Sequence, residues 1–129
     1  VDELLRFNGP VQNTVRVPLE PVTYTGLDGE PIIVDPGSIV TTCLGAANRD
    51  PALFDKPDAL RLDRPNAQRH LALASGIHYC LGASLARMEA TVALTRLIRR
   101  FDRIELVGTP TWRDRYTIRG VDHLEVEFS

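Results

Sequence analysis

One cysteine of the sequence occupies a position at which a thiolate could do chemistry. Cys80 follows the glycine-bearing run Ser75–Tyr79, and a helical pattern begins directly after it. The backbone N–H groups and the dipole at the start of a helix favour a negatively charged sulfur there. Such a thiolate can attack a substrate, respond to the redox state or bind a metal ion.

The residues around Cys80 are compatible with three kinds of site to different degrees. A zinc site needs about four ligands, whereas His78 and Cys80 supply two, and no CxxC motif completes the set. A catalytic cysteine needs a base and an oxyanion site, and His78 is a candidate base with no further residue beside it. Ligation of a haem iron needs one thiolate, a backbone that a flat group can approach, donors for the propionates and a supporting helix. The sequence supplies the thiolate at Cys80, a glycine at position 82 and a helical pattern after them.

The spacing G-x-H-x-C-x-G-x-x-L-A-R, over residues 76–87, resembles the cysteine-ligand loop of the cytochrome P-450 monooxygenases, the haem-thiolate enzymes. The resemblance implies that Cys80 is the axial ligand of a haem b. It further implies that Gly82, which has no side chain, lets the cofactor approach the backbone. By the same resemblance, His78 and His70 donate hydrogen bonds to the haem propionates.

Two residues just before this loop depart from the family pattern. The family usually has Phe and Gly where this sequence has Leu73 and Ala74. Leu73 can replace only part of the contact that the phenylalanine makes beside the cysteine. If position 74 requires a positive φ, an alanine there is strained by about 1 kcal/mol or more. We therefore expect unusual haem retention or an unusual reduction potential.

A second pattern lies at the start of the sequence, where residues 1–7 are expected to be helical. Glu3 and Arg6 are neighbours on such a helix. An isolated E-x-x-R motif is usually a surface ion pair that contributes about 0–1 kcal/mol. In the family, an arginine before the cysteine loop completes the motif, and Arg64 occupies that place. The resemblance therefore implies a buried structural triad whose loss would destabilise the fold severely.

The run 11–17 alternates like a strand after Asn8-Gly9-Pro10 ends the first helix. The resemblance implies that Arg16 reaches a haem propionate, which suits a guanidinium in a partly buried site; the alternative is an exposed strand arginine. It also implies that the start of this run and the tip of a closing hairpin line the substrate pocket, through Val11, Gln12, Asn13, Thr117 and Ile118.

The remaining pattern predicts an α+β chain. The sequence indicates a hairpin over 22–34, a strand over 38–42, a turn over 46–51, an irregular meander over 52–69, a helix over 81–100, and strands over 104–106 and 124–128. By resemblance, this is the C-terminal portion of the mainly helical cytochrome P-450 fold, in which the meander wraps the proximal side of the haem. Cys43 is expected to be a small buried apolar residue.

Composition excludes several other classes of protein. The 129 residues are 43% apolar and 25% charged, as in ordinary globular proteins. No run approaches the roughly 20 apolar residues of a membrane span, and no export signal is visible. The net charge of −2 argues against a nucleic-acid partner. Two cysteines form no disulfide framework, so a reduced, cytoplasmic setting is expected.

The sequence begins at Val1, inside a predicted helix, and lacks the oxygen-activating helix that the family places upstream. We therefore expect residues 1–129 to be the C-terminal, haem-ligating portion of a longer protein, inactive alone. For that protein, the resemblance implies insertion of one oxygen atom of O2 into a small organic substrate. Electrons would come from a ferredoxin-type or other donor docked on arginines of the long helix and the loop. The alternative is a haem-free truncated product that acts as a binding or regulatory module.

Overall fold

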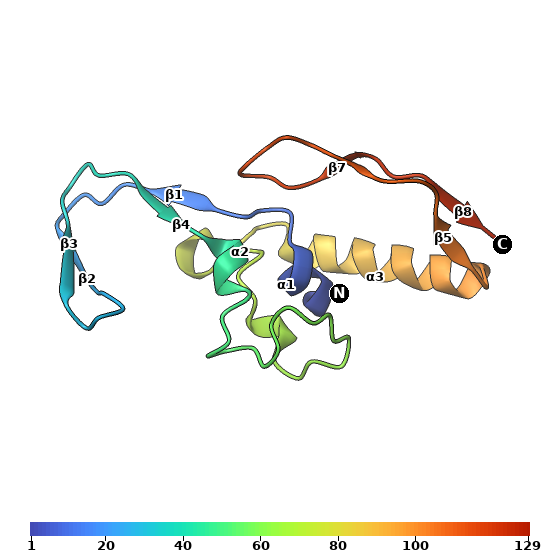
Figure 1. Cartoon of the computed structure of the whole chain (residues 1–129), viewed down its shortest axis with the longest axis horizontal. Coiled ribbons are helices and arrows are strands. Elements are labelled where there is room, and N and C mark those ends of the chain that lie inside the picture. The colour runs from blue at the N-terminus through green and yellow to red at the C-terminus, as the bar shows by residue number, and fades with distance from the viewer.

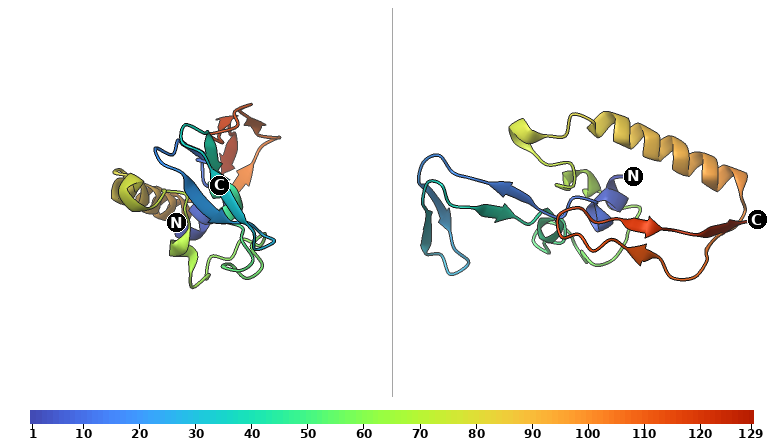
Figure 2. Two further views of the ribbon diagram at one scale, coloured as in Figure 1. Left: turned by 90° about the vertical axis from the view of Figure 1, so that its left-hand side faces the viewer. Right: turned by 90° about the horizontal axis from the view of Figure 1, so that it is seen from above.

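The computed structural model describes all residues, 1–129, and shows an elongated chain (Figure 1). Helix α1 (Asp2–Asn8) and the short helix α2 (Leu44–Ala47) lie near its middle. The long helix α3 (Ala83–Arg100) extends towards one end, and a β-hairpin projects at the other end, as the view from above in Figure 2 also shows. None of the helices combines the length and apolar character that a membrane crossing requires.

The strands form four separate antiparallel pairs rather than one sheet. The pairs are β1 (Thr14–Arg16) with β4 (Val40–Thr42), β2 (Val22–Thr25) with β3 (Pro31–Val34), β5 (Ile104–Leu106) with β8 (Val126–Phe128), and β6 (Thr111–Trp112) with β7 (Val121–His123). The strands predicted from alternation are present, although several are shorter than expected. The predicted turn over 46–51 is too broad, because α2 occupies its first two residues. A helix of four residues has too few positions to show helical periodicity.

Helix α3 confirms the helix that the spacing of apolar residues predicts over 81–100, with a start two residues later. Gly82 precedes it, and the chain leaves the helix at Phe101, whose backbone is extended. The ring of Phe101 packs on Phe128 of β8, with the ring centroids 4.5 Å apart. The end of α3 is thereby joined to the last strand of the chain.

The meander that follows α2 contains little regular structure, as predicted over 52–69, apart from a 3-10 helix at Ala67–Arg69. A second 3-10 helix, Gly76–His78, lies in the cysteine loop. The few buried residues gather where the meander meets α1. Phe54 is 1% exposed, and the guanidinium groups of Arg6 and Arg64 lie over its ring at 5.2 and 6.0 Å. Polar and charged side chains make up half of the buried set: Glu3, Arg6, Asn13, Asn48, Arg64 and His70.

The chain exposes far more surface than a compact protein of its mass. Its accessible surface is 9842 Å², whereas the scaling for folded monomers gives about 6,800 Å² for 14.3 kDa. The apolar stripe of α3 is part of the excess, because its side chains are open to solvent: Leu85, Met88, Val92, Leu94, Leu97 and Ile98. The spacing that predicts a buried helix face is present, but this chain supplies little to cover that face.

Candidate cofactor-binding site

Cys80 lies in an exposed loop between the 3-10 helix Gly76–His78 and α3. Its N–H donates to the carbonyl of Leu73 at 3.0 Å, and its carbonyl accepts from the N–H of Ala83 at 3.1 Å. A Cβ added at Gly82 would lie 3.8 Å from the sulfur of Cys80, with no other atom within 4 Å. The glycine therefore leaves space beside the sulfur that a side chain would fill.

The backbone at Ala74 shows that the departure from the family pattern has a structural cost. Its φ is +60°, close to the +64° of Gly76 in the same loop. A residue with a Cβ is disfavoured in this left-handed region by about 1–2 kcal/mol. Position 74 therefore adopts the positive φ at which an alanine is strained. Its N–H donates to the carbonyl of Leu71 at 2.9 Å, which helps to hold the turn.

The donor set around Cys80 fits a haem iron better than the alternatives. The chain has no cluster of three or more His, Cys, Asp or Glu side chains that could hold a metal ion. A haem needs fewer ligands from the protein, since the porphyrin supplies four and the protein adds one axial sulfur. Cys80 is a free, exposed thiol at the start of a helix, and the open side at Gly82 suits a flat group.

Two residues predicted to contact the propionates are accessible. His78 is exposed, in the loop itself. Arg16 is exposed on β1, where its guanidinium donates to the carbonyl of Val15 at 2.8 Å and has no carboxylate partner. Both side chains are available to an anionic group, so their contact with haem propionates stays a prediction.

His70 lies in a different environment from the one that the resemblance implies. It is buried, its Nε2 lies 3.4 Å from a carboxylate oxygen of Asp2, and its Nδ1 accepts from the N–H of Ala72 at 3.1 Å. Burial lowers the pKa of His70, while Asp2 partly opposes that effect. The neutral ring then has its remaining N–H directed at Asp2. This arrangement leaves no donor for a propionate and argues against that role.

Arg87 connects the first helix to the cysteine loop, and sequence reasoning missed this role. Its Nε donates to the Asp2 carboxylate at 2.8 Å, and its Nη1 donates to the phenol oxygen of Tyr79 at 2.8 Å. The bond from Arg87 lowers the pKa of Asp2. Asp2 and Arg87 are 85 residues apart in sequence, and no local pattern relates them.

The structure brings the three members of the predicted triad together. Arg6 donates to both carboxylate oxygens of Glu3 at 2.7 and 2.8 Å, and the Nε of Arg64 lies 3.1 and 3.0 Å from the same two oxygens. All three residues are buried. Hydrogen bonding from Arg6, helped by the N–H of Arg61 and by Arg64, holds the pKa of Glu3 at about 2 against the cost of burial. The carboxylate is charged at neutral pH.

Asn48 ties the triad to the segment that leads into the loop. Its carbonyl accepts from Arg6 at 2.9 Å, while its side-chain oxygen accepts from the N–H of Leu71 at 2.7 Å. Asp50, in contrast, makes a local contact within the turn, where its carboxylate accepts from the N–H of Ala52 at 2.8 Å. The long-range contact of Asn48 has no signal in the sequence.

The predicted pocket residues from the two ends of the chain lie side by side. Val11 forms a β-bridge with Ile118, the N–H of Gln12 donates to the carbonyl of Thr117 at 3.0 Å, and the amide of Asn13 donates to the carbonyl of Tyr116 at 3.2 Å. The tip of the β6–β7 hairpin is thereby fixed beside the segment after α1. This closeness is a fact of the fold, whereas substrate contact stays a prediction.

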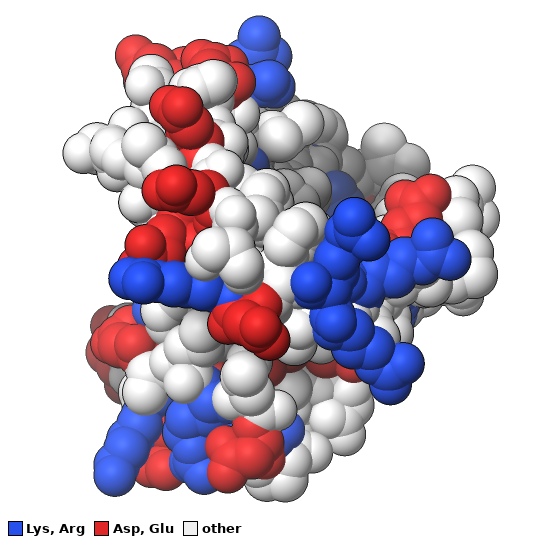
Figure 3. All heavy atoms as spheres, turned by 90° about the vertical axis from the view of Figure 1, so that its right-hand side faces the viewer, with Lys and Arg blue, Asp and Glu red and all other residues white.

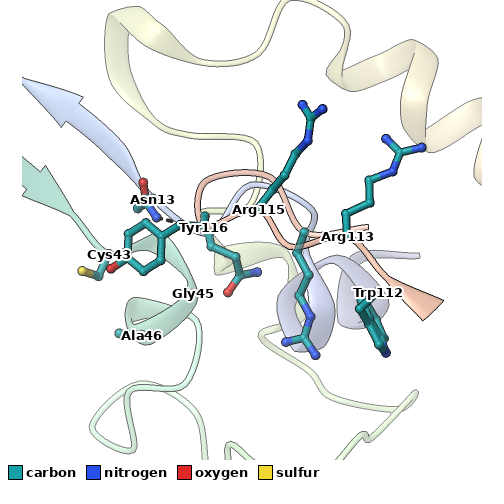
Figure 4. A pocket seen from close by; sticks show the side chains of 10 residues that line it. Asn13, Cys43, Gly45, Ala46, Trp112, Arg113, Arg115 and Tyr116 are labelled. Atoms are coloured by element: carbon teal, nitrogen blue, oxygen red, sulfur yellow. Dashed lines mark hydrogen bonds between the residues drawn. The ribbon is translucent and has the colours of Figure 1, made fainter. Parts of the chain in front are cut away.

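A hollow of about 440 Å³ lies beside this junction (Figure 4). Gln12, Asn13 and Tyr116 line it together with Cys43 and Trp112. The prediction that Cys43 is a buried apolar residue is wrong, because the side chain is exposed at this hollow. It lies at the end of the short strand β4, where little of this chain covers it.

Basic side chains gather on one part of the surface, visible as the large blue cluster in Figure 3. A surface hollow on the last turns of α3 is lined by Thr95, Arg96, Arg99 and Arg100, without an acidic residue. Several arginines elsewhere in the chain have carboxylate partners, such as Arg113 with Asp122 at 2.6 Å. The end of α3 therefore presents uncompensated positive charge.

Comparison with known proteins identifies the family. A model of the family described as Cytochrome P-450 matches residues 1–114. The chain belongs to the cytochrome P-450 family. The structure also resembles that of P450BioI, solved in complex with an acyl carrier protein ligated to hexadec-9Z-enoic acid, with a TM-score of 0.89 and 36% sequence identity over 99% of this chain. The fold is thus the α+β C-terminal part of a cytochrome P-450, as predicted.

Two curated relatives show how much of such a protein the chain spans. It is 41% identical over 98% of its length to the beta-dihydromenaquinone-9 omega-hydroxylase of Mycobacterium tuberculosis. It is 40% identical over its whole length to PksS of Bacillus subtilis, a polyketide biosynthesis cytochrome P-450. The matches cover 24% and 31% of these relatives, and 32% of P450BioI. The chain spans about a quarter to a third of the length of the proteins that it matches.

Proposed function

We propose that this chain is the haem-ligating portion of a haem-thiolate monooxygenase and that Cys80 is the axial ligand. The observation that carries the proposal is the exposed sulfur beside Gly82, at the start of α3, in a chain of the cytochrome P-450 family. A thiolate-ligated haem supplies the chemistry that cleaves O2 and inserts one of its oxygen atoms into an organic substrate.

The residues of the chain bind and orient this group. Cys80, at the start of α3, would supply its sulfur as the thiolate ligand of the haem. His78 and Arg16 donate to the two carboxylates at the haem edge, because both side chains are exposed and free of carboxylate partners. Glu3, Arg6 and Arg64 keep the meander on α1 and take no part in the chemistry.

The junction of the two chain ends forms one wall of the substrate pocket. Its side chains are mixed in polarity, with Val11 and Ile118 bridged beside Gln12 and Asn13. Such a wall fits a small organic substrate that carries at least one polar group. Two relatives are named for hydroxylation of beta-dihydromenaquinone-9 and for polyketide biosynthesis, and both names describe conversion of an organic molecule.

A reductant must supply electrons, and an acidic protein fits the basic surface. Arg96, Arg99 and Arg100 lack carboxylate partners, so docking of an acidic ferredoxin-type donor would bring opposite charges together. Such an interface gains on-rate from electrostatic steering and weakens as salt is added.

The remainder of a longer protein would cover the exposed apolar face of α3. This proposal is supported by the excess of exposed surface and by the partial coverage of relatives. It follows that the chain alone would not turn over substrate. A haem-free binding module is the competing function.

The experiment is a haem assay and a reduced, CO-bound absorption spectrum of the full-length protein. The proposal predicts bound haem and the red-shifted band of a thiolate-ligated iron. Haem with only the band of a neutral ligand would contradict the role of Cys80. A native polypeptide that has the intact mass of residues 1–129 and holds no haem would favour the binding module.

A further inference from the structure

The loop that carries Cys80 is weakly attached to the rest of the chain. Most of residues 75–82 are exposed, with Ile77 and Leu81 almost fully so. Backbone bonds close the loop on itself, chiefly from Cys80 to Leu73 and from Tyr79 to Gly76, each at 3.0 Å. The bond from Arg87 to the phenol oxygen of Tyr79 is the single side-chain hydrogen bond that these residues make.

This bond is well placed to restrain the sulfur. Tyr79 directly precedes Cys80, so the position of its ring limits the backbone angles at the ligand. Arg87 stands on the first turns of α3, and its planar fork holds Tyr79 with one nitrogen and Asp2 with another, both at 2.8 Å. Arginine is suited to this task because its donors have a fixed geometry.

Asp2 provides the fixed end of the connection. It belongs to α1, and the next residue, Glu3, is buried in the triad with Arg6 and Arg64. Buried His70 also contacts Asp2, at 3.4 Å. Tyr79 is thereby linked through Arg87 to the most firmly held part of the structure.

We propose that Arg87 is a positioning residue that orients Cys80 by holding Tyr79, with Asp2 as its anchor. This inference rests on the proposed haem ligation by Cys80. It assigns to Arg87 the role of keeping the haem bound and the sulfur correctly oriented. Without the bond, the loop samples a wider range of orientations of Cys80, and fewer of them suit ligation. Haem loss then becomes faster, and a smaller share of the reduced CO complex shows the thiolate band.

The test uses the full-length holoprotein and a double-mutant cycle of Arg87→Gln and Tyr79→Phe. The readouts are the share of the reduced CO complex that shows the thiolate band, the reduction potential, and the rate of haem transfer to a haem-scavenging apoprotein. Loss of one charge-assisted hydrogen bond predicts about a 5- to 10-fold faster transfer in each single variant. Haem transfer from the double variant should be no faster than from the faster of the two single variants, because both changes remove the same contact.

Two controls make the outcome decisive. Glu89→Gln removes a charge from an exposed position of the same helix, where the side chain makes no ion pair, and should leave all three readouts unchanged. Arg87→Lys can donate well to only one of the two partners. Its rate of haem transfer should therefore lie between those of Arg87→Gln and the wild type. Single variants whose readouts equal those of Glu89→Gln, or effects that multiply in the double variant, overturn the role of Arg87. A wild-type protein without the thiolate band would instead overturn the proposed function, and this inference with it.

Discussion

The triad around Glu3 and the loop around Cys80 are held by contrasting means. Buried Glu3 accepts hydrogen bonds from buried Arg6 and Arg64, and from the N–H of Arg61. Cys80 is exposed, in a loop that has one side-chain hydrogen bond and a strained residue, Ala74, at its start. The buried cluster is fixed by several bonds that must all be satisfied, whereas the loop depends on a few contacts whose removal leaves the fold intact.

This difference predicts where substitutions affect stability and where they affect the ligand. In the triad, removal of one partner leaves a buried charge without compensation. In the loop, solvent replaces a lost contact, so the free energy of unfolding changes little while the geometry of the sulfur changes. The free energy of unfolding should therefore respond strongly to changes in the triad and weakly to changes in the loop.

The largest effect is expected for Arg64→Ala. It leaves the Glu3 carboxylate buried with one guanidinium fewer, and should lower the free energy of unfolding of the full-length protein by about 3–5 kcal/mol. Denaturant unfolding measures the change. Asp58→Ala is the matched control, because that carboxylate pairs with Arg49 at the surface and is 84% exposed. The control should cost about 0–1 kcal/mol, and equal losses in the two variants would refute the buried role of the triad.

A somewhat smaller effect is expected from acid. The pKa of Glu3 is about 2 in the folded protein, against an ordinary value of 4.5. Between these values the unfolded chain binds more protons, so stability is fully present above pH 4.5 and is lost as the pH falls through about 2. The contribution amounts to about 3 kcal/mol. Unfolding curves measured between pH 5 and pH 2 should show this loss of stability in the wild type and not in Glu3→Gln. An identical pH dependence of the free energy of unfolding in the two proteins would contradict the lowered pKa of Glu3.

The smallest effect is expected at the loop. Ala74→Gly relieves the strain of a positive φ and should raise the free energy of unfolding by about 0.5–1 kcal/mol, less than the full strain because glycine also gains freedom in the unfolded chain. Ala86→Gly, in the exposed interior of α3, should lower it by about 0.5–1 kcal/mol. Changes of the same sign in these two variants would show that Ala74 is unstrained.

Contacts that depend on local spacing can be predicted from the sequence, whereas contacts that depend on tertiary packing cannot. Glu3 and Arg6 share a helix face by their spacing, so their pairing can be predicted, and the dense motif of the cysteine loop predicts a ligand at Cys80. Asp2 with Arg87, and Asn48 with Leu71, join residues 85 and 23 positions apart and depend on how the irregular meander folds back. The exposure of Cys43 and the burial of His70 likewise follow from tertiary packing, which no local pattern encodes.

The central claim is that Cys80, and not Cys43, is the sulfur that ligates the haem. The direct test is the reduced, CO-bound spectrum of full-length Cys80→Ala beside that of Cys43→Ala, with folding checked by circular dichroism. Both cysteines are free and exposed, which makes the pair a matched comparison. The account predicts that the thiolate band disappears in Cys80→Ala and persists in Cys43→Ala. Persistence of the band in Cys80→Ala would contradict it.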